Sequence, residues 1–267
     1  MNMDERMNLN FSDISSNYVT FAQEKHACCR CSLYEHYKHV GQSEGNACDP
    51  TFLFVGEALG KDEVGAGKPF VGRAGQRLRL ELRKYKKVFN KKSVLISNVL
   101  PCRPLNNKFP KYGDKFTVYP DNRKKEEKSL ETDAQYLVNN RMKHWLHREI
   151  KITKPKVIVT LGAIPLEYVY GEKGITNSRG TWKFIPQIRA WALATFHPSY
   201  VLRCVNDPDK AYVVDMFEQD IAKVAKTWRS IVDNDYRMRL SDADWEKRMG
   251  LEAKSYLFKG LGYVTND

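Results

Sequence analysis

Four short apolar runs recur along the middle of the chain, and each is bounded by glycine, proline or histidine. They are TFLFVGE, SVLISNVLP, KPKVIVTLG and RAWALATFHPSY, at 51–57, 93–101, 154–162 and 189–200. Their β-branched and aromatic residues are typical of strands, and the third run is nearly continuous, like a strand buried on both faces. The pattern therefore predicts four strands.

The segments between and after these runs have helical spacing. Residues 72–88 form a basic amphipathic stretch, and 136–152 repeats apolar residues at helical intervals. A short helix is expected after 162, and a long helical region begins near Ala211. Strands separated by helix-length segments indicate βαβ units. We predict an α/β fold of three layers, α/β/α, around a central, mostly parallel four-stranded sheet.

One segment, 106–135, departs from this alternation. It is polar, charged and broken by two prolines, so it predicts a long insertion between a strand and a helix. Because it starts just after the carboxyl end of a strand, it could border a ligand cleft or form solvated surface. The expected organisation is an N-terminal extension, one α/β domain and a C-terminal extension, at 1–25, 26–228 and 229–267.

The chain is strongly basic. Lys and Arg outnumber Asp and Glu by 44 to 32, which gives a formal net charge of +12. An excess of this size favours a polyanionic partner over a surface that is merely solubilised by its cations. No apolar run approaches the roughly 18 residues of a membrane span, and the N-terminus lacks the features of a secretory signal. We expect an intracellular monomer, cytoplasmic or associated with the nucleoid.

Polar residues follow three of the predicted strands. The GEALG segment, Asn98 and His197 each come where a strand ends, and open α/β sheets bind ligands at that edge. Phe70 adds an aromatic face, and Glu57 and Glu63 add carboxylates. GEALG is not a dinucleotide fingerprint, and no phosphate-binding P-loop occurs. An amide beside an aromatic ring suits a planar heterocycle, which indicates a nucleobase turned out of a nucleic acid strand.

Four motifs in order carry a family resemblance: FVGEALGKDEVGAGKPFVGRAGQ, SNVLPCRP, PKVIVTLG and HPSYVLR. Together with an upstream CRCSL they resemble the family 4 uracil-DNA glycosylases, the iron–sulfur branch of the uracil-DNA glycosylase superfamily. The resemblance covers about 26–228. It implies an enzyme that binds DNA and hydrolyses the N-glycosidic bond of uracil with water as the nucleophile, leaving an abasic site.

The resemblance also implies a role for each matching residue. Phe70 would stack on the extruded base, and Asn98 would read its Watson–Crick edge. His197 would donate a hydrogen bond to the carbonyl oxygen that gains charge as the bond breaks. The backbone around Gly56 and Ala58 would hold the water and the base.

Two acidic residues belong to the same implied site, because Glu63 falls where the family has a carboxylate and Glu57 shares its loop. With Asn98 and His197 they complete the expected catalytic set. The segment after His197 would insert into the duplex beside the flipped base. The residues expected to contact DNA are Arg73, Tyr200, Leu202 and Arg203.

The family holds a 4Fe–4S cluster with four cysteines, and this chain matches three of them. Cys28, Cys31 and Cys102 occupy the first three positions, whereas Met142 falls at the fourth, and a thioether is a poor cluster ligand. A substitute could come from another cysteine or from a histidine, or the site could have decayed into apolar thiols. The candidate substitutes are Cys29, Cys48, His144 and His147.

Other interpretations stay open. Taken alone, His197 could be an ordinary buried histidine and Asn98 a turn residue; their order and placement together favour the functional interpretation. Leu59 replaces the proline that is usual in the family's loop, which leaves room for an enzyme retargeted to a modified pyrimidine. A third hypothesis is a glycosylase-like DNA-binding subunit that assists or inhibits another protein, whose identity the sequence does not indicate.

Overall fold

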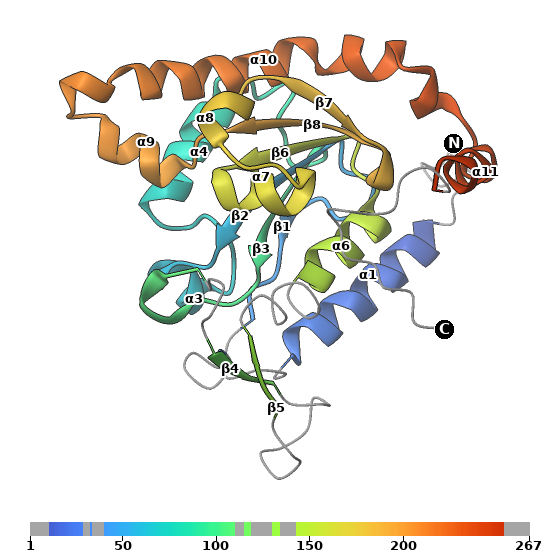
Figure 1. Cartoon of the computed structure of the whole chain (residues 1–267), viewed down its shortest axis with the longest axis horizontal. Helices are drawn as coiled ribbons and strands as arrows, with labels where there is room; N and C mark the ends of the chain where they lie inside the picture. The colour runs from blue at the N-terminus through green and yellow to red at the C-terminus, as the bar shows by residue number, and fades with distance from the viewer. Residues whose placement is uncertain are drawn as a thin grey trace.

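The structure is a computed structural model, and it describes residues 11–28, 33, 40–109, 115–118, 130–133 and 143–253. Its centre is a six-stranded sheet in the order β1-β3-β2-β6-β8-β7 (Figure 1). The four inner strands, β3 (Val94–Leu100), β2 (Phe52–Ala58), β6 (Val157–Leu161) and β8 (Ala190–Thr195), are parallel. The four predicted parallel strands are therefore confirmed, but the sheet has six strands rather than four.

Two edge strands extend this sheet beyond the prediction. β1 (Glu44–Gly45) pairs antiparallel with β3, and β7 (Trp182–Ile185) pairs antiparallel with β8. β1 is too short for any periodicity. β7 exposes Lys183 and buries Ile185, so it lacks the continuous apolar run that marks the inner strands.

Helices cover both faces of the sheet, which confirms the three layers. Successive residues of β2 point to opposite faces: Phe52 and Phe54 join one apolar core, and Leu53 and Val55 join the other. The first core is closed by α4 (Arg73–Arg83), α9 (Pro198–Cys204) and α10 (Tyr212–Asn234). The second is closed by α6 (Lys143–Thr153) and α7 (Ala163–Tyr170), with α1 (Phe11–His26) packed on α6.

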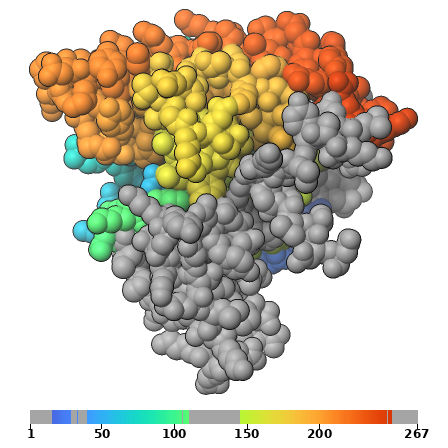
Figure 2. Space-filling view, viewed as in Figure 1, coloured from blue at the N-terminus to red at the C-terminus, as the bar shows by residue number. Residues whose placement is uncertain are grey.

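The remaining elements are short, apart from one C-terminal helix. Within the predicted insertion, β4 and β5 pair antiparallel as a separate two-stranded sheet. In the space-filling view, the α7–β7 region and α10 form adjoining parts of one surface (Figure 2). The remaining elements of the fold are α3 (Lys61–Ala66), η2 (Leu105–Asn107), β4 (Lys115–Val118), β5 (Leu130–Asp133), α8 (Ile175–Ser178), η4 (Pro186–Ile188), η5 (Pro208–Lys210), η6 (Tyr236–Arg239) and α11 (Asp242–Ala253).

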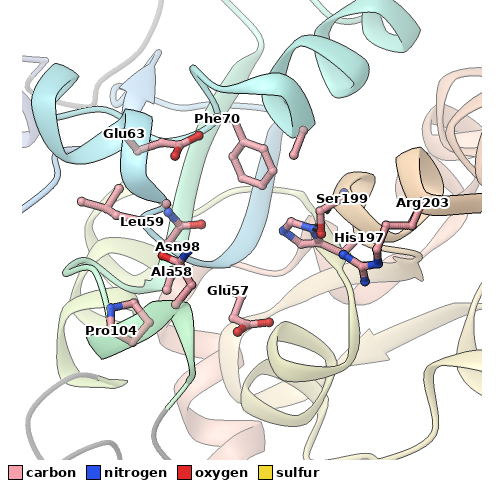
Figure 3. Close-up of a pocket in the computed structure, with 13 residues that line it drawn as sticks. Glu57, Ala58, Leu59, Glu63, Phe70, Asn98, Pro104, His197, Ser199 and Arg203 are labelled. Carbon is pink, nitrogen blue, oxygen red and sulfur yellow. Dashed lines mark hydrogen bonds between the residues drawn. The ribbon is translucent and has the colours of Figure 1, made fainter.

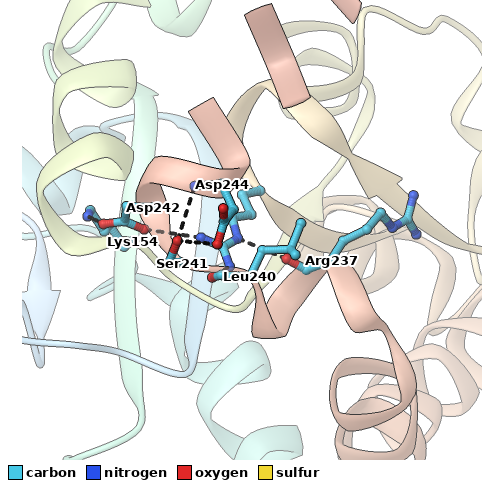
Figure 4. A network of polar contacts seen from close by, with 7 residues as sticks. Lys154, Arg237, Leu240, Ser241, Asp242 and Asp244 are labelled. Atoms are coloured by element: carbon cyan, nitrogen blue, oxygen red, sulfur yellow. Dashed lines mark hydrogen bonds and ion pairs between the residues drawn. The ribbon is translucent and has the colours of Figure 1, made fainter. Parts of the chain in front are cut away.

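Polar contacts tie the C-terminal segment to the end of the sheet (Figure 4). The Arg189 guanidinium donates to the carbonyl oxygens of Arg237 and Leu240 and to the carboxylate of Asp242. Lys154 Nζ lies 2.8 Å from the same carboxylate. α10 also runs without interruption through the expected domain boundary at 228. The domain boundaries themselves stay a prediction.

A buried carboxylate anchors the N-terminal helix. Glu149 of α6 is fully buried and accepts hydrogen bonds from Tyr18 of α1, at 2.8 Å, and from Ser43 and Ser97. The ammonium group of Lys25, at the end of α1, is also buried and lies 3.9 Å from the carboxylate. Burial of a charge is costly unless it is paired and hydrogen-bonded, so this network fixes α1 against α6 and β3.

We expect Glu149→Gln to lower the free energy of unfolding by about 3 kcal/mol, because the buried Lys25 would lose its counter-charge. Urea denaturation followed by circular dichroism measures this loss. Glu24→Gln is the matched control, since Glu24 pairs with Arg148 on the surface and such pairs contribute little. Equal stabilities of the two variants would contradict the anchoring role.

Candidate active site

A pocket of about 450 Å³ opens at the carboxyl ends of the parallel strands (Figure 3). In the register of β2 with β3, Gly56 lies opposite Asn98, and His197 follows two residues after β8. The strand ends thus bring together the residues that the sequence predicted would converge. The lining residues are Glu57, Ala58, Leu59, Gly60, Glu63, Phe70, Ala74, Asn98, Pro104, Asn107, His197, Ser199 and Arg203.

The amide of Asn98 is the most unusual polar group in the pocket. The residue is only 7% exposed, and its Oδ1 is buried without a hydrogen-bond partner in the described part of the chain. An unsatisfied buried acceptor costs about 1–3 kcal/mol. A donor in the pocket, such as the N–H of a heterocycle, would satisfy this oxygen.

A glycine allows the amide and an aromatic ring to meet. A Cβ at Gly56 would lie 2.3 Å from Asn98 Oδ1 and 2.5 Å from Phe70 Cζ, so no other residue fits between them. Phe70 has a φ of +56°, an uncommon backbone conformation for a residue with a side chain. A Cβ at Gly75 would lie 1.7 Å from the Phe70 carbonyl oxygen, so the first turn of α4 makes room for this conformation.

The hydrogen bonds of His197 determine its protonation. The residue caps α9, and its Nδ1 accepts from the backbone N–H of Ser199 at 3.1 Å, with the Ser199 hydroxyl at 2.8 Å. Because a backbone N–H can only donate, Nδ1 carries no proton and the neutral ring holds it on Nε2. Burial, and then the positive charge of Arg203, lower the pKa of His197 to about 4. His197 is therefore a neutral donor at physiological pH.

The two predicted carboxylates have different surroundings. Burial raises the pKa of Glu57, which lines the pocket beside Ala58. Glu63 Oε1 accepts a hydrogen bond from the backbone N–H of Gly72 at 3.0 Å, and Gly72 caps α4. Glu63 therefore links α3 to the start of α4, a structural task that the sequence did not reveal. Catalytic roles for both carboxylates stay a prediction.

The residues expected to contact DNA lie around the pocket rather than all within it. Arg203 lines it, and its guanidinium lies over the Tyr200 ring, 5.6 Å from the centroid. Tyr200 also packs edge-on against Phe196. Tyr200, Leu202 and the exposed Arg73 are not among the lining residues.

Sequence reasoning missed several lining residues. Ser199 lies within the HPSYVLR motif, two positions after a histidine that caps a helix. This spacing could have predicted that Ser199 lies beside His197. Pro104 ends the CRP motif and Asn107 follows it, and Asn107 accepts a hydrogen bond from Arg103 at 2.8 Å. Leu59 was noticed only as a substitution; its side chain is 3% exposed and forms part of the wall.

The structure describes two of the three candidate cluster cysteines. Cys102 is buried just after β3, and Cys28 packs against the same apolar core. Cys31 and Met142 lie outside the described residues. Within the described ranges, no three His, Cys, Asp or Glu side chains are grouped to hold a metal. Two thiols in one apolar core fit part of a cluster site.

Comparisons with known proteins agree with this geometry. The family model described as Uracil DNA glycosylase superfamily matches residues 42–219. The Type-4 uracil-DNA glycosylase of Thermotoga maritima is 35% identical over 201 residues, which cover 72% of this chain and 86% of that protein. The protein of the same name from Sulfurisphaera tokodaii is 28% identical over 241 residues, covering 87% and 96%. Saccharolobus solfataricus has another that is 28% identical over 222 residues, covering 80% and 88%.

This chain therefore belongs to the uracil DNA glycosylase superfamily and, within it, to the type-4 uracil-DNA glycosylases. The family resemblance seen in the sequence is confirmed. No helix among the described residues is long and apolar enough to cross a membrane.

The neutrality of His197 predicts an unusual pH dependence. Its pKa of about 4 lies below the ordinary value of 6.5, so the ring stays neutral until the pH falls toward 4. We expect single-turnover activity to show no inflection near pH 6.5, and the ¹H–¹³C NMR signal of the ring to titrate near 4. Arg203→Gln should raise this pKa, because it removes a nearby positive charge. A ring that titrates near 6.5 in the unmodified protein would contradict the buried, capped geometry.

Proposed function

We propose that the pocket receives a uracil turned out of DNA and that His197, Asn98 and Phe70 act directly on it. Membership of the type-4 family supports the reaction, which is hydrolysis of the N-glycosidic bond to leave an abasic site for base excision repair. The unpartnered Oδ1 of Asn98 is the observation that supports these roles most strongly.

The amide matches the hydrogen-bonding edge of uracil. Asn98 Oδ1 would accept from the N3–H of the base, and its Nδ2 would donate to the O4 carbonyl. Cytosine presents an acceptor at N3 and an amino group at C4, so its edge opposes both hydrogen bonds. A site that leaves buried polar groups unpaired with the wrong substrate discriminates strongly. Phe70 supplies an apolar surface for stacking.

The chemistry requires stabilisation of a departing anion. As the bond between C1′ and N1 breaks, its electron pair goes to the uracil ring and charge develops on the O2 carbonyl. The Nε2–H of His197 would donate to this oxygen, and a preorganised donor of this kind contributes roughly 10²–10³ in rate. Because the ring is neutral, it stabilises the anion without giving up its proton.

Water completes the reaction at C1′. The backbone of Gly56 and Ala58 would hold this water, whose oxygen forms the new bond to the oxocarbenium-like sugar. Its proton would pass to Glu57, since burial raises the pKa of this carboxyl and makes it a better base. Among the described residues that line the pocket there is no lysine.

Cationic residues at the rim would hold the DNA. Arg203 at the pocket and the exposed Arg73 at the start of α4 are placed to contact phosphates, and the net charge of +12 supports such contacts. Tyr200 and Leu202, on α9, would insert beside the extruded base. Wedges of this kind help to offset the cost of unstacking.

We further propose that Cys28, Cys31 and Cys102 are ligands of an iron–sulfur cluster. The support is the family and the shared apolar core of Cys28 and Cys102. The group would join the end of α1 to the end of β3, and its role would be structural. The fourth ligand is open, because Met142 stands at the family's cysteine position.

Two substitutions test recognition of the base and catalysis separately. His197→Ala should slow single-turnover excision of uracil by roughly 10²–10³, because it removes the donor to the anion, and should leave DNA affinity nearly unchanged. Asn98→Asp replaces an amide by an acceptor-only carboxylate, so uracil excision should collapse and residual activity should shift toward cytosine. Cleavage of a uracil-containing oligonucleotide at alkali-labile sites measures both.

Matched controls are His26→Ala and Asn234→Asp, which make the same changes at exposed positions. Full uracil excision by Asn98→Asp would show that Asn98 is not the reader. If the unmodified protein ignored uracil but cleaved a modified pyrimidine in a His197-dependent way, the enzyme would be a retargeted glycosylase. DNA binding without cleavage of any base would indicate the accessory subunit.

The cluster has its own test. Protein purified without oxygen should be brown and contain iron and sulfide, and Cys102→Ser should bleach it. Cys204→Ser is the matched control, because Cys204 is equally buried but packs in the opposite core. Colourless, iron-free protein that folds normally would show that this chain has lost the cluster.

A further inference from the structure

A second hollow lies away from the active site, between the C-terminal half of α4 and the edge of the sheet. It encloses about 330 Å³ and shares no lining residue with the active-site pocket. Whereas Asn98 reaches the pocket from the carboxyl end of β3, Val94 and Ile96 reach this groove from the amino end of the same strand. With Leu82 and Phe89 they form an apolar floor.

The rim of this groove is positively charged. Arg83, Lys86 and Lys91 line it and are exposed, and none has a hydrogen bond or ion pair from its side chain within the described part of the chain. The single acid in the lining, Glu44, is already paired with Arg79 at 2.9 Å. The groove therefore combines an apolar floor with an uncompensated positive rim.

Two neighbouring cations, Arg77 of α4 and Lys84 just after it, are already paired. Arg77 contacts Glu81 and Glu218, at 3.0 and 2.6 Å, and Lys84 also contacts Glu218, at 2.9 Å. Arg83, Lys86 and Lys91 differ from these two paired neighbours, because their charges are available to a partner at the groove. Leu80 is 56% exposed three residues before Arg83, so it is a neighbour of Arg83 on the helix surface and extends the apolar area.

We propose that this groove docks an acidic segment of a protein partner that carries an apolar side chain. Carboxylates of the segment would pair with Arg83, Lys86 and Lys91, and the apolar side chain would enter the hollow. The argument is one of complementarity: an apolar anchor in a pocket supplies affinity, and charges around it supply orientation and rate of association.

Nucleic acid matches the rim but not the floor. Phosphates would pair with the cations and leave the apolar surface uncovered. Phe89 is only 6% exposed and makes T-shaped contacts with Phe52, Phe54 and Tyr85, so little of its ring is open for a base to stack on. A short aliphatic or aromatic side chain on an acidic backbone satisfies both parts of the groove.

Fluorescence anisotropy tests the proposal on the full chain. The probe is a short fluorescein-labelled peptide with a central Leu-Phe pair flanked by Asp and Glu. We expect saturable binding that weakens with salt and is lost when the pair is replaced by Ser-Ser. The double variant Arg83→Glu, Lys86→Glu should weaken binding about tenfold or more, because it places like charges against the peptide. Uracil excision should be unchanged.

The matched control is Lys87→Glu, Lys92→Glu, which changes the net charge equally at exposed positions outside the groove. Equal loss of peptide binding in both double variants, or equal binding of the Ser-Ser peptide, would overturn the proposal by showing a diffuse charge effect. Uracil-free duplex DNA is the second probe. If the groove variant weakened duplex binding and the peptide failed to bind, the groove would be a nucleic acid contact and the proposal wrong.

Discussion

The register between β2 and β3 is the constraint on which the active site depends. It sets Gly56 opposite Asn98, and the absence of a side chain at Gly56 leaves room beside its backbone for both the Asn98 amide and the Phe70 ring. A slip of one residue would send every side chain of the strand to the other face. The two apolar cores, with alternate residues of β2 in each, hold this register. Stability of the sheet and recognition of the base thus rest on the same pairing.

Several features of the pocket cost stability and are explained by function. Phe70 holds an uncommon backbone conformation, Asn98 keeps a buried acceptor without a partner, and burial keeps His197 neutral. Each feature lowers the stability of the folded protein, and selection normally removes strain and unsatisfied polar groups for that reason. A uracil in the pocket would supply the donor that Asn98 lacks and an acceptor for the Nε2–H of His197. In the proposed function, these unfavourable terms would be offset by binding of the base and by stabilisation of the transition state.

The basic residues lie in several different environments, which the net charge alone does not indicate. Part of it is used internally, as in the pairs of Arg77 with Glu218 and of Arg179 with Asp220. Arg203 lowers the pKa of His197 and stands at the pocket, where it can act on both the base and the DNA. Arg83 and its neighbours form a separate surface. Part of the net charge of +12 is therefore used in ion pairs within the fold, and part of it lies on separate surfaces of the protein.

The sequence by itself determined the four parallel strands and the convergence of Asn98 and His197. Buried parallel strands read as continuous apolar runs, and their carboxyl ends must meet at one edge of the sheet. The family motifs added roles to those positions. These inferences use only the local pattern of residues and the order of the motifs along the chain. Both can be taken from a single sequence.

Only the tertiary structure decided the features that join distant segments. Three contacts have no local signature in the sequence: Glu63 with Gly72, Leu59 with Gly41, and Lys25 with Glu149. At Gly41, a Cβ would lie 2.7 Å from Leu59 Cδ1. The edge strand β7 was missed because it exposes Lys183 and buries only Ile185, so it lacks the continuous apolar run of the inner strands. Such contacts are set by which faces meet when the layers pack, and burial and pairing exist only after that packing.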